Sequence, residues 1–257
     1  MALVTCDLFS EALGCGTSVT VVLPQHTEEQ IGVAEPGASL LHGPPPVLYL
    51  LHGLSDDHTA WLRYTSIERY AAAHGVAVVM PAVGKSFYAN EAHGHAYWDY
   101  VSEELPALVA RFFRVSQEPE RTFVAGLSMG GYGALKHAFT HPERFAAAAS
   151  LSGVVDVQEL VGALGRHELV DRVFDGALRP EDDLFALLSG VDPAVAPRLY
   201  VGCGTDEGLL LPANERLVGA ARERGLDVRV DLRPGTHEWG LWDAQIQDVL
   251  AWLVSGS

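Results

Sequence analysis

Apolar runs of six or seven residues alternate with longer amphipathic segments along most of this 257-residue chain. The apolar, often β-branched runs predict strands at 17–23, 46–51, 75–80, 121–126, 145–151, 198–203 and 227–232. The amphipathic segments predict helices at 61–75, 97–113, 131–139, 213–225 and 241–254. Parallel neighbouring strands need a crossover connection, usually a helix. The alternation therefore predicts an α/β fold with a mostly parallel sheet and helices on both faces.

Three segments depart from this alternation. No helix separates the first two predicted strands, so we expect them to pair as an antiparallel hairpin at one edge of the sheet. The segment from Pro24 to Pro46 carries Pro and Gly residues and predicts a surface loop. Residues 156–197 predict short helices that form a cap-like insertion over the sheet. Because the sequence contains no linker or internal repeat, we predict one domain over residues 1–257.

Acidic residues outnumber basic ones, and the formal net charge is −16 at pH 7. This charge repels phosphate backbones and anionic membrane surfaces, and no cluster of Lys or Arg offsets it locally. The longest apolar runs are also too short to cross a bilayer. We therefore expect no nucleic-acid partner and no membrane insertion.

The three cysteines, Cys6, Cys15 and Cys203, have neither metal-ligand spacing nor the even count of a disulfide framework. The first residues contain no basic region, and acidic residues precede any apolar segment of signal-peptide length. We therefore expect a cytoplasmic protein without a metal or a cofactor. A homo-oligomer is compatible with the sequence, through an exposed edge strand or through residues 156–197.

The stretch GLSMG at 126–130 has the Gly-x-Ser-x-Gly pattern of a nucleophile elbow, in which a serine occupies a strained turn between a strand and a helix. A predicted strand precedes it and a predicted helix follows it, as the pattern requires. Glycines are needed there because side chains would collide with the neighbouring strand and helix. Ser128 is therefore a candidate nucleophile.

A serine hydroxyl is a weak nucleophile at neutral pH, so it needs a base within hydrogen-bond reach and a carboxylate that orients this base. Enzymes with this elbow carry these groups in the order Ser, acid, His. Here the strand at 198–203 precedes GTDEG, with Asp206 and Glu207, and the strand at 227–232 precedes THEWG, with His237. Each candidate follows the carboxyl end of a strand, where open α/β sheets place their sites.

Acyl transfer also needs two backbone N–H groups that bind the oxyanion of the tetrahedral intermediate. We expect one from Met129, which follows the nucleophile, and the other from Leu54, in the loop after the strand at 46–51. Gly53 would let this loop approach the substrate closely. His52, beside it, is expected to brace the loop rather than to transfer protons.

These stretches occur together in a known family. The strings VLYLLHGLSDDHTAW, YWDYVSEELP, FVAGLSMGGYGALKHA, CGTDEGLL and GTHEWGLW resemble the tributyrin esterase branch of the esterase D-like α/β-hydrolases, from the first predicted strand to the last helix. That group also contains S-formylglutathione hydrolases, some acetyl xylan and feruloyl esterases, and secreted mycolyl transferases. The resemblance implies an α/β-hydrolase fold, Ser128 as nucleophile, His237 as general base and an acid in GTDEG.

The acid stays open between two neighbouring residues. The family usually reads Gly-Thr-Glu-Asp, with the catalytic Asp three residues after the Gly, and counting from Gly204 in this chain gives Glu207. Matching the residue type instead selects Asp206. The run LLL that follows is one residue longer than usual, which makes counting through this loop unsafe. We favour Asp206 and keep Glu207 as the alternative, since glutamate can also orient the base.

We therefore predict a serine carboxylesterase that hydrolyses short-chain acyl esters of small molecules through an acyl-enzyme. Gly53 and Trp239 are predicted to contact the substrate, and residues 83–96 and 156–197 are expected to form the pocket walls. The alternatives are a thioesterase of the S-formylglutathione hydrolase type and an acetyl xylan or feruloyl esterase. An acyltransferase, which would be expected to carry a secretion signal, and an inactive scaffold used for binding are further from the observed pattern.

Overall fold

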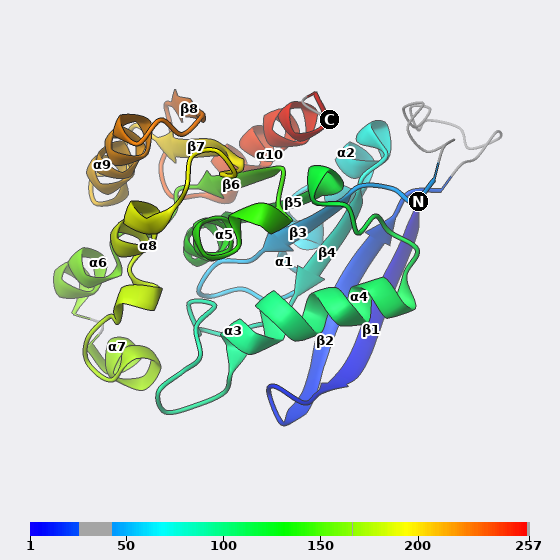
Figure 1. The fold of residues 1–257 in the computed structure, drawn as a ribbon, viewed down its shortest axis with the longest axis horizontal. Helices are drawn as coiled ribbons and strands as arrows, with labels where there is room; N and C mark the ends of the chain where they lie inside the picture. The colour runs from blue at the N-terminus through cyan, green and yellow to red at the C-terminus, as the bar shows by residue number, and fades with distance from the viewer. Residues whose placement is uncertain (26–42, 166, 256–257) are drawn as a thin grey trace.

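The computed structural model describes residues 1–25, 43–165 and 167–255. Within these residues, eight strands form one sheet in the order β1-β2-β4-β3-β5-β6-β7-β8 (Figure 1). The strands are β1 (Ala2–Ser10), β2 (Cys15–Leu23), β3 (Val47–Leu51), β4 (Ala77–Pro81), β5 (Thr122–Leu127), β6 (Ala147–Leu151), β7 (Arg198–Gly204) and β8 (Val228–Arg233). The pairs β1–β2 and β2–β4 are antiparallel, whereas the other neighbours are parallel.

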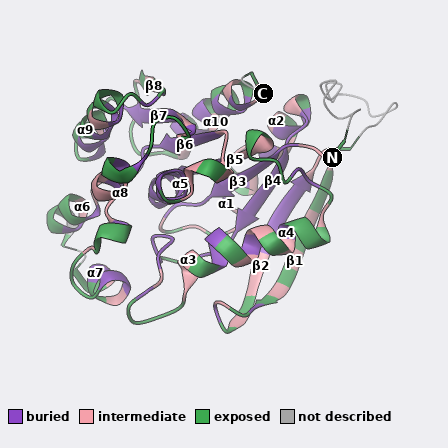
Figure 2. Cartoon of the chain, viewed as in Figure 1, coloured by how far each residue is buried: buried purple, intermediate pink, exposed green. Residues whose placement is uncertain are grey.

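The central strands are buried on both faces, as Figure 2 shows, while the β1–β2 hairpin is partly exposed. In β3, Val47, Tyr49 and Leu51 contribute to the core on one face of the sheet. Leu48 and Leu50 contribute to the core on the other face. This alternation explains why β3 is apolar throughout, since a parallel strand covered on both sides has no solvent-facing side.

Helices cover both faces of the sheet, as predicted. One face carries α1 (Ala60–Tyr64), α2 (Ile67–His74) and α10 (Trp239–Val254). The other carries α4 (Leu105–Phe112), α5 (Met129–Thr140), α8 (Leu184–Gly190) and α9 (Leu210–Glu223). The short α3 (Tyr97–Asp99) continues through a π-helical turn at Tyr100–Glu104 into α4, and single 3₁₀ turns lie at Pro119–Arg121, Pro142–Arg144 and Pro180–Asp182. No helix among the described residues combines the length and the apolar character needed to cross a bilayer.

The edge of the sheet differs from the prediction. The hairpin expected between the first two predicted strands is wrong, because β2 pairs with β1 and β4, and β3 lies on the far side of β4. The prediction missed β1, whose residues are mostly exposed or half-buried because the strand is at the sheet edge. The predicted loop from Pro24 to Pro46 lies mostly outside the described residues.

The helix predicted at 61–75 is two helices. The Thr65 hydroxyl donates to the Trp61 carbonyl (2.5 Å) and accepts from the Ile67 N–H (3.0 Å). The Thr65 hydroxyl thus bonds backbone groups that a continuous helix would pair with other backbone groups. Ser and Thr side chains compete with helical hydrogen bonds in this way, and α1 ends before α2 begins.

Residues 156–197 form α6 (Val157–Leu164), α7 (His167–Phe174) and α8, beside the carboxyl ends of the strands (Figure 1). A buried ion pair joins this segment to α5, since Lys136 Nζ lies 2.6 Å from Asp182 Oδ1 and both side chains are at most 3% exposed. The Tyr132 hydroxyl also donates to the Asp182 carbonyl at 2.6 Å. The helix that follows Ser128 therefore holds the insertion in place.

Candidate active site

Ser128 lies in the turn between β5 and α5, with backbone angles φ 54° and ψ −116°. This positive φ is strained for a residue with a side chain, and such strain persists only where the surroundings enforce it. Here the surroundings enforce it, because Gly126 and Gly130 on either side of Ser128 pack directly against backbone atoms of neighbouring segments. A Cβ on Gly126 would overlap the Gly130 carbonyl, and a Cβ on Gly130 would lie 2.8 Å from the His52 carbonyl oxygen. The packing that was expected of these glycines is present.

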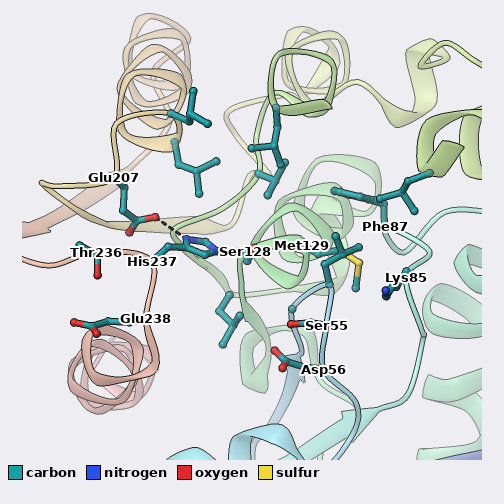
Figure 3. Close-up of a pocket in the computed structure, with 18 of the residues that line it drawn as sticks. Ser55, Asp56, Lys85, Phe87, Ser128, Met129, Glu207, Thr236, His237 and Glu238 are labelled. Atoms are coloured by element: carbon teal, nitrogen blue, oxygen red, sulfur yellow. Dashed lines mark hydrogen bonds and ion pairs between the residues drawn. The ribbon is translucent and has the colours of Figure 1, made fainter. Parts of the chain in front are cut away.

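Ser128, His237 and Glu207 form a hydrogen-bonded chain, in which the His237 ring lies between the other two side chains (Figure 3). His237 Nε2 is 3.0 Å from Ser128 Oγ, and His237 Nδ1 is 2.7 Å from Glu207 Oε2. A carboxylate only accepts hydrogen bonds, so Nδ1 carries the ring proton and Nε2 is free to accept from the serine hydroxyl. This is the arrangement in which an imidazole can take a proton from a serine.

The Glu207 carboxylate is buried, with 2% of its side chain exposed. Burial by itself raises its pKa, but hydrogen bonds from His237, Ser152 and the Gly204 N–H outweigh this effect, and the pKa is lowered overall. The Ser152 hydroxyl and the Gly204 N–H reach Oε1 at 2.5 and 2.9 Å. The carboxylate is therefore held in its charged form, with one oxygen directed at His237.

This geometry corrects the preference for Asp206, because Glu207 is the residue that contacts His237. Asp206 is exposed, and its backbone N–H donates to the Gly235 carbonyl at 3.1 Å. After β7 the chain turns, and the Glu207 N–H donates back to Gly204 at 3.3 Å, which directs the Glu207 side chain inward. Counting from Gly204 therefore identified the contact, whereas matching residue type did not.

Ser152 and Trp242 support the Glu207 carboxylate and were not assigned this part from the sequence. The Trp242 indole N–H donates to Ser152 Oγ at 3.0 Å, so the Ser152 proton is directed to Glu207. The Trp242 ring also packs edge-on against His237, with centroids 4.8 Å apart. The sequence signal for Ser152 is its place directly after the strand predicted at 145–151, at the carboxyl edge of the sheet. In the structure its φ is 47°.

Replacing Ser152 with alanine is expected to lower kcat about tenfold, because Glu207 loses a charge-assisted hydrogen bond worth about 1.5–3 kcal/mol. Ser150→Ala is the matched control, since the buried Ser150 hydroxyl has no hydrogen-bond partner in the described part of the chain. Steady-state hydrolysis of p-nitrophenyl butyrate by both variants measures the difference. Equal kcat values for the two variants would show that Ser152 does not act through Glu207.

The loop after β3 carries Gly53 and Leu54, and His52 braces it as expected. The Val83 N–H donates to His52 Nε2 at 3.1 Å, so the ring proton resides on Nδ1 and is donated to the Gly53 carbonyl at 2.7 Å. The Tyr88 hydroxyl donates to the His52 carbonyl at 2.9 Å. Burial lowers the pKa of His52 to about 4, which keeps the ring neutral and able to accept from Val83.

This neutral, buried His52 makes the protein sensitive to acid. In the unfolded chain a histidine has a pKa near 6.5, whereas His52 in the folded protein has a pKa of about 4. The contribution of neutral His52 to the free energy of unfolding is therefore complete above pH 6.5 and is lost as the pH falls towards 4. We expect His52 to lower the free energy of unfolding by about 2–3 kcal/mol between pH 7 and 4.5. Urea unfolding at both pH values, with His52→Asn for comparison, measures this. The variant should be less stable at pH 7 but lose less on acidification; an identical loss would exclude His52 as the cause.

The Leu54 and Met129 amides lie at the two backbone positions expected of an oxyanion hole. Met129 is the first residue of α5, where N–H groups have no partner inside the helix. Neither amide donates to an acceptor within residues 1–25, 43–165 and 167–255. A Cβ on Gly53 would lie 2.7 Å from a methyl group of Leu127 and 3.8 Å from Ser128 Cβ, so only glycine lets this loop lie so close to the serine.

The chain Ser128–His237–Glu207 opens into a cleft of about 1650 Å³. Gly53, Leu54, Met129 and Trp239 also line it, so the cleft contains every residue predicted to bind substrate. Trp239 packs at the same time against Tyr64, with stacked rings 4.9 Å apart, and edge-on against Trp61 and Trp242. It therefore forms a fixed wall of the cleft.

Both segments expected to form the walls do line the cleft. Lys85 and Phe87 come from the 83–96 segment, and Leu160, Glu168 and Leu169 from the insertion. Figure 3 shows Lys85 and Phe87 on the opposite side of Ser128 from Glu207.

Hydrogen bonds tie the two walls together. The Ala92 N–H donates to the Val173 carbonyl at 2.9 Å, and Arg172 forms an ion pair with the buried Glu91 carboxylate and donates to the Lys85 carbonyl at 2.9 Å. The walls are therefore one connected structure.

Known proteins resemble this chain over nearly its whole length. The family model described as Putative esterase matches residues 10–253. The substrate-bound structure of FphF, a fluorophosphonate-binding serine hydrolase of Staphylococcus aureus, is 32% identical over 98% of both chains, with a TM-score of 0.87. The S-formylglutathione hydrolase FrmB of the same organism is 31% identical over 98% of both chains, with a TM-score of 0.81. An acetyl esterase of Caldicellulosiruptor saccharolyticus is 26% identical, again over 98% of both chains.

These similarities confirm the predicted α/β-hydrolase fold and the predicted class of enzyme. The protein is a serine hydrolase that acts on carboxylic esters. Since the family model matches most of the sequence, the chain belongs to the esterase family described as Putative esterase.

Proposed function

We propose that the protein hydrolyses short-chain carboxylic esters through an acyl-enzyme formed on Ser128. The observation that carries this proposal is the chain of hydrogen bonds from Ser128 Oγ through His237 to Glu207, at 3.0 and 2.7 Å, inside a large cleft. Ser128 acts as the nucleophile, His237 as the general base and acid, and Glu207 as the carboxylate that orients His237.

In the first half-reaction, Ser128 Oγ bonds to the ester carbonyl carbon while its proton moves to His237 Nε2. The N–H groups of Leu54 and Met129 bind the resulting oxyanion, and the Glu207 carboxylate stabilises the imidazolium. The tetrahedral intermediate then collapses. The bond from the carbonyl carbon to the alkoxy oxygen breaks, and Nε2 gives its proton to the leaving alcohol.

In the second half-reaction, a water molecule replaces the alcohol. His237 Nε2 takes a proton from this water as its oxygen bonds to the acyl carbon, and the same amides bind the oxyanion. Collapse breaks the bond to Ser128 Oγ, which recovers the proton from Nε2. The carboxylic acid leaves, and Ser128 is ready for another ester.

Two observations support short acyl chains. The acetyl esterase relative acts on a short acyl group by its name, and the sequence resembles the tributyrin esterase branch, whose name implies butyryl esters. We therefore propose acetyl and butyryl esters, tributyrin among them, as substrates. The likeness to an S-formylglutathione hydrolase at 31% identity favours thioester hydrolysis as the second candidate.

Labelling and kinetics together test this proposal. A fluorophosphonate probe should modify Ser128, as peptide mass spectrometry would identify. In a series of p-nitrophenyl esters from acetate to octanoate, kcat/KM should be highest at acetate or butyrate and should exceed the value for S-formylglutathione. Labelling at another residue would overturn the assignment of Ser128, and highest kcat/KM at octanoate would overturn the short-chain assignment.

We also propose a cytoplasmic location. All three cysteines are free, and Cys203 is buried, where its raised pKa makes the thiol unreactive. Three unpaired cysteines suit a reducing compartment.

A further inference from the structure

The ionisable side chains around the cleft are mostly acidic. Beyond Glu207, the carboxylates that line it are Asp56, Glu168, Asp206 and Glu238, and Lys85 is the single Lys or Arg among the described lining residues. None of these four carboxylates takes part in an ion pair within the described parts of the chain. No neighbouring cation neutralises their charges, so the lining of the cleft has an excess of negative charge.

Asp56 is a carboxylate close to the nucleophile. It lies on the loop after β3. A Cβ added to Gly53 would be 2.9 Å from Asp56 Oδ2 and 3.8 Å from Ser128 Cβ, so Asp56 and Ser128 border the same small space. Figure 3 shows Asp56 next to Ser55, below Ser128 in this view. The oxyanion loop thus carries a negative charge close to the nucleophile.

The surroundings of Asp56 favour a cationic partner. Partial burial raises the pKa of Asp56, against the smaller opposing effects of the Gly53 N–H, Arg63 and His237. A half-buried carboxylate without an ion-pair partner is stabilised when a positive charge approaches it. The net charge of −16 adds a field of the same sign over the whole molecule.

We propose that Asp56 and the acidic rim of the cleft select neutral and cationic esters and disfavour anionic ones. The inference rests on the proposed function, because it describes the substrate of the Ser128 site. A glutathione thioester carries two carboxylates and one ammonium group, so it is an anionic substrate and is disfavoured. Lys85, on the opposite side of Ser128 from Glu207, opposes this selection only in part because it is a single charge.

Three p-nitrophenyl esters of similar size test the selection, those of butyric, succinic and 4-(trimethylammonio)butyric acid. At low ionic strength, kcat/KM for the cationic ester should exceed that for the anionic ester by roughly tenfold or more, with the neutral ester between them. In about 0.5 M NaCl the ratio should shrink severalfold, since salt shortens the range of exposed charges. The ratio of cationic to anionic kcat/KM cancels effects common to both substrates.

Two substitutions should move this ratio in opposite directions. Asp56→Asn keeps the shape of the side chain and should lower the ratio about three- to tenfold, and Lys85→Gln should raise it by a smaller factor. Glu120→Gln is the control. It makes the same change in net charge at an exposed residue that precedes β5, whereas Ser128 follows the other end of this strand. The control should leave the ratio unchanged.

The two proposals fail in different ways. If none of the three esters is hydrolysed, the proposed function fails. If all three are hydrolysed with equal kcat/KM, or if Asp56→Asn and Glu120→Gln change the ratio equally, the ester hydrolase stands and the charge selection is overturned. A ratio that favours the anionic ester would also overturn it and would assign the selection to Lys85.

Discussion

Replacing Ser128 with alanine is expected to lower kcat for p-nitrophenyl butyrate by roughly 10⁵–10⁶-fold, as loss of the nucleophile does in a serine protease. Without the hydroxyl no acyl-enzyme can form, and the remaining rate comes from binding and from the oxyanion N–H groups alone. Steady-state kinetics with a long incubation would measure the loss. Labelling by a fluorophosphonate should disappear in parallel.

The fold should tolerate this change. Serine already occupies φ 54° and ψ −116°, and alanine carries the same Cβ without new atoms. The thermal midpoint should therefore stay within a few degrees of the wild type, which circular dichroism would show. A folded Ser128→Ala variant with turnover near the wild-type value would refute Ser128 as the nucleophile.

Replacing Glu207 with glutamine is expected to lower kcat by roughly 10³–10⁴-fold, the scale seen when a triad carboxylate becomes an amide. A glutamine can offer an N–H to His237 Nδ1, which favours the ring tautomer with its proton on Nε2. That tautomer cannot accept the Ser128 proton. The same kinetic assay measures the loss, and KM should change far less than kcat because Glu207 acts through His237.

Asp206→Asn is the matched control, since it makes the same chemical change at the neighbouring residue. Asp206 is exposed, so its amide variant should keep kcat within about twofold. A larger loss in Asp206→Asn than in Glu207→Gln would restore the preference for Asp206 and would show that the loop rearranges when substrate binds.

Glu207 also contributes to stability in a pH-dependent way. Its folded pKa is lowered although burial opposes this, so the stabilisation is present above the ordinary pKa of a glutamate and is lost as the pH falls through the folded value. The residue that orients His237 therefore also stabilises the native state at neutral pH.

The sequence pattern predicted the central strands well because each is buried on both faces and reads as an apolar run. β3, for example, is buried throughout, from Val47 to Leu51. The pattern failed at β1, where the edge position leaves most residues exposed or half-buried and removes the apolar signal. It also failed for the pairing of β2, because pairing depends on which strand lies beside it in space and not on order in the chain.

By itself, the amino-acid sequence determined the elbow pattern around Ser128, the order of the proposed nucleophile, acid and histidine, and the strand ends at which they stand. These are properties of local pattern and of spacing along the chain, so they can be read without coordinates. Only the tertiary structure separated Asp206 from Glu207, because Glu207 is buried and contacts His237 whereas the adjacent Asp206 is exposed. It also brought Ser152 to Glu207 across 55 positions of the sequence and Trp242 to Ser152 across 90, and it placed Asp56 near Ser128, through packing of separate strands and helices.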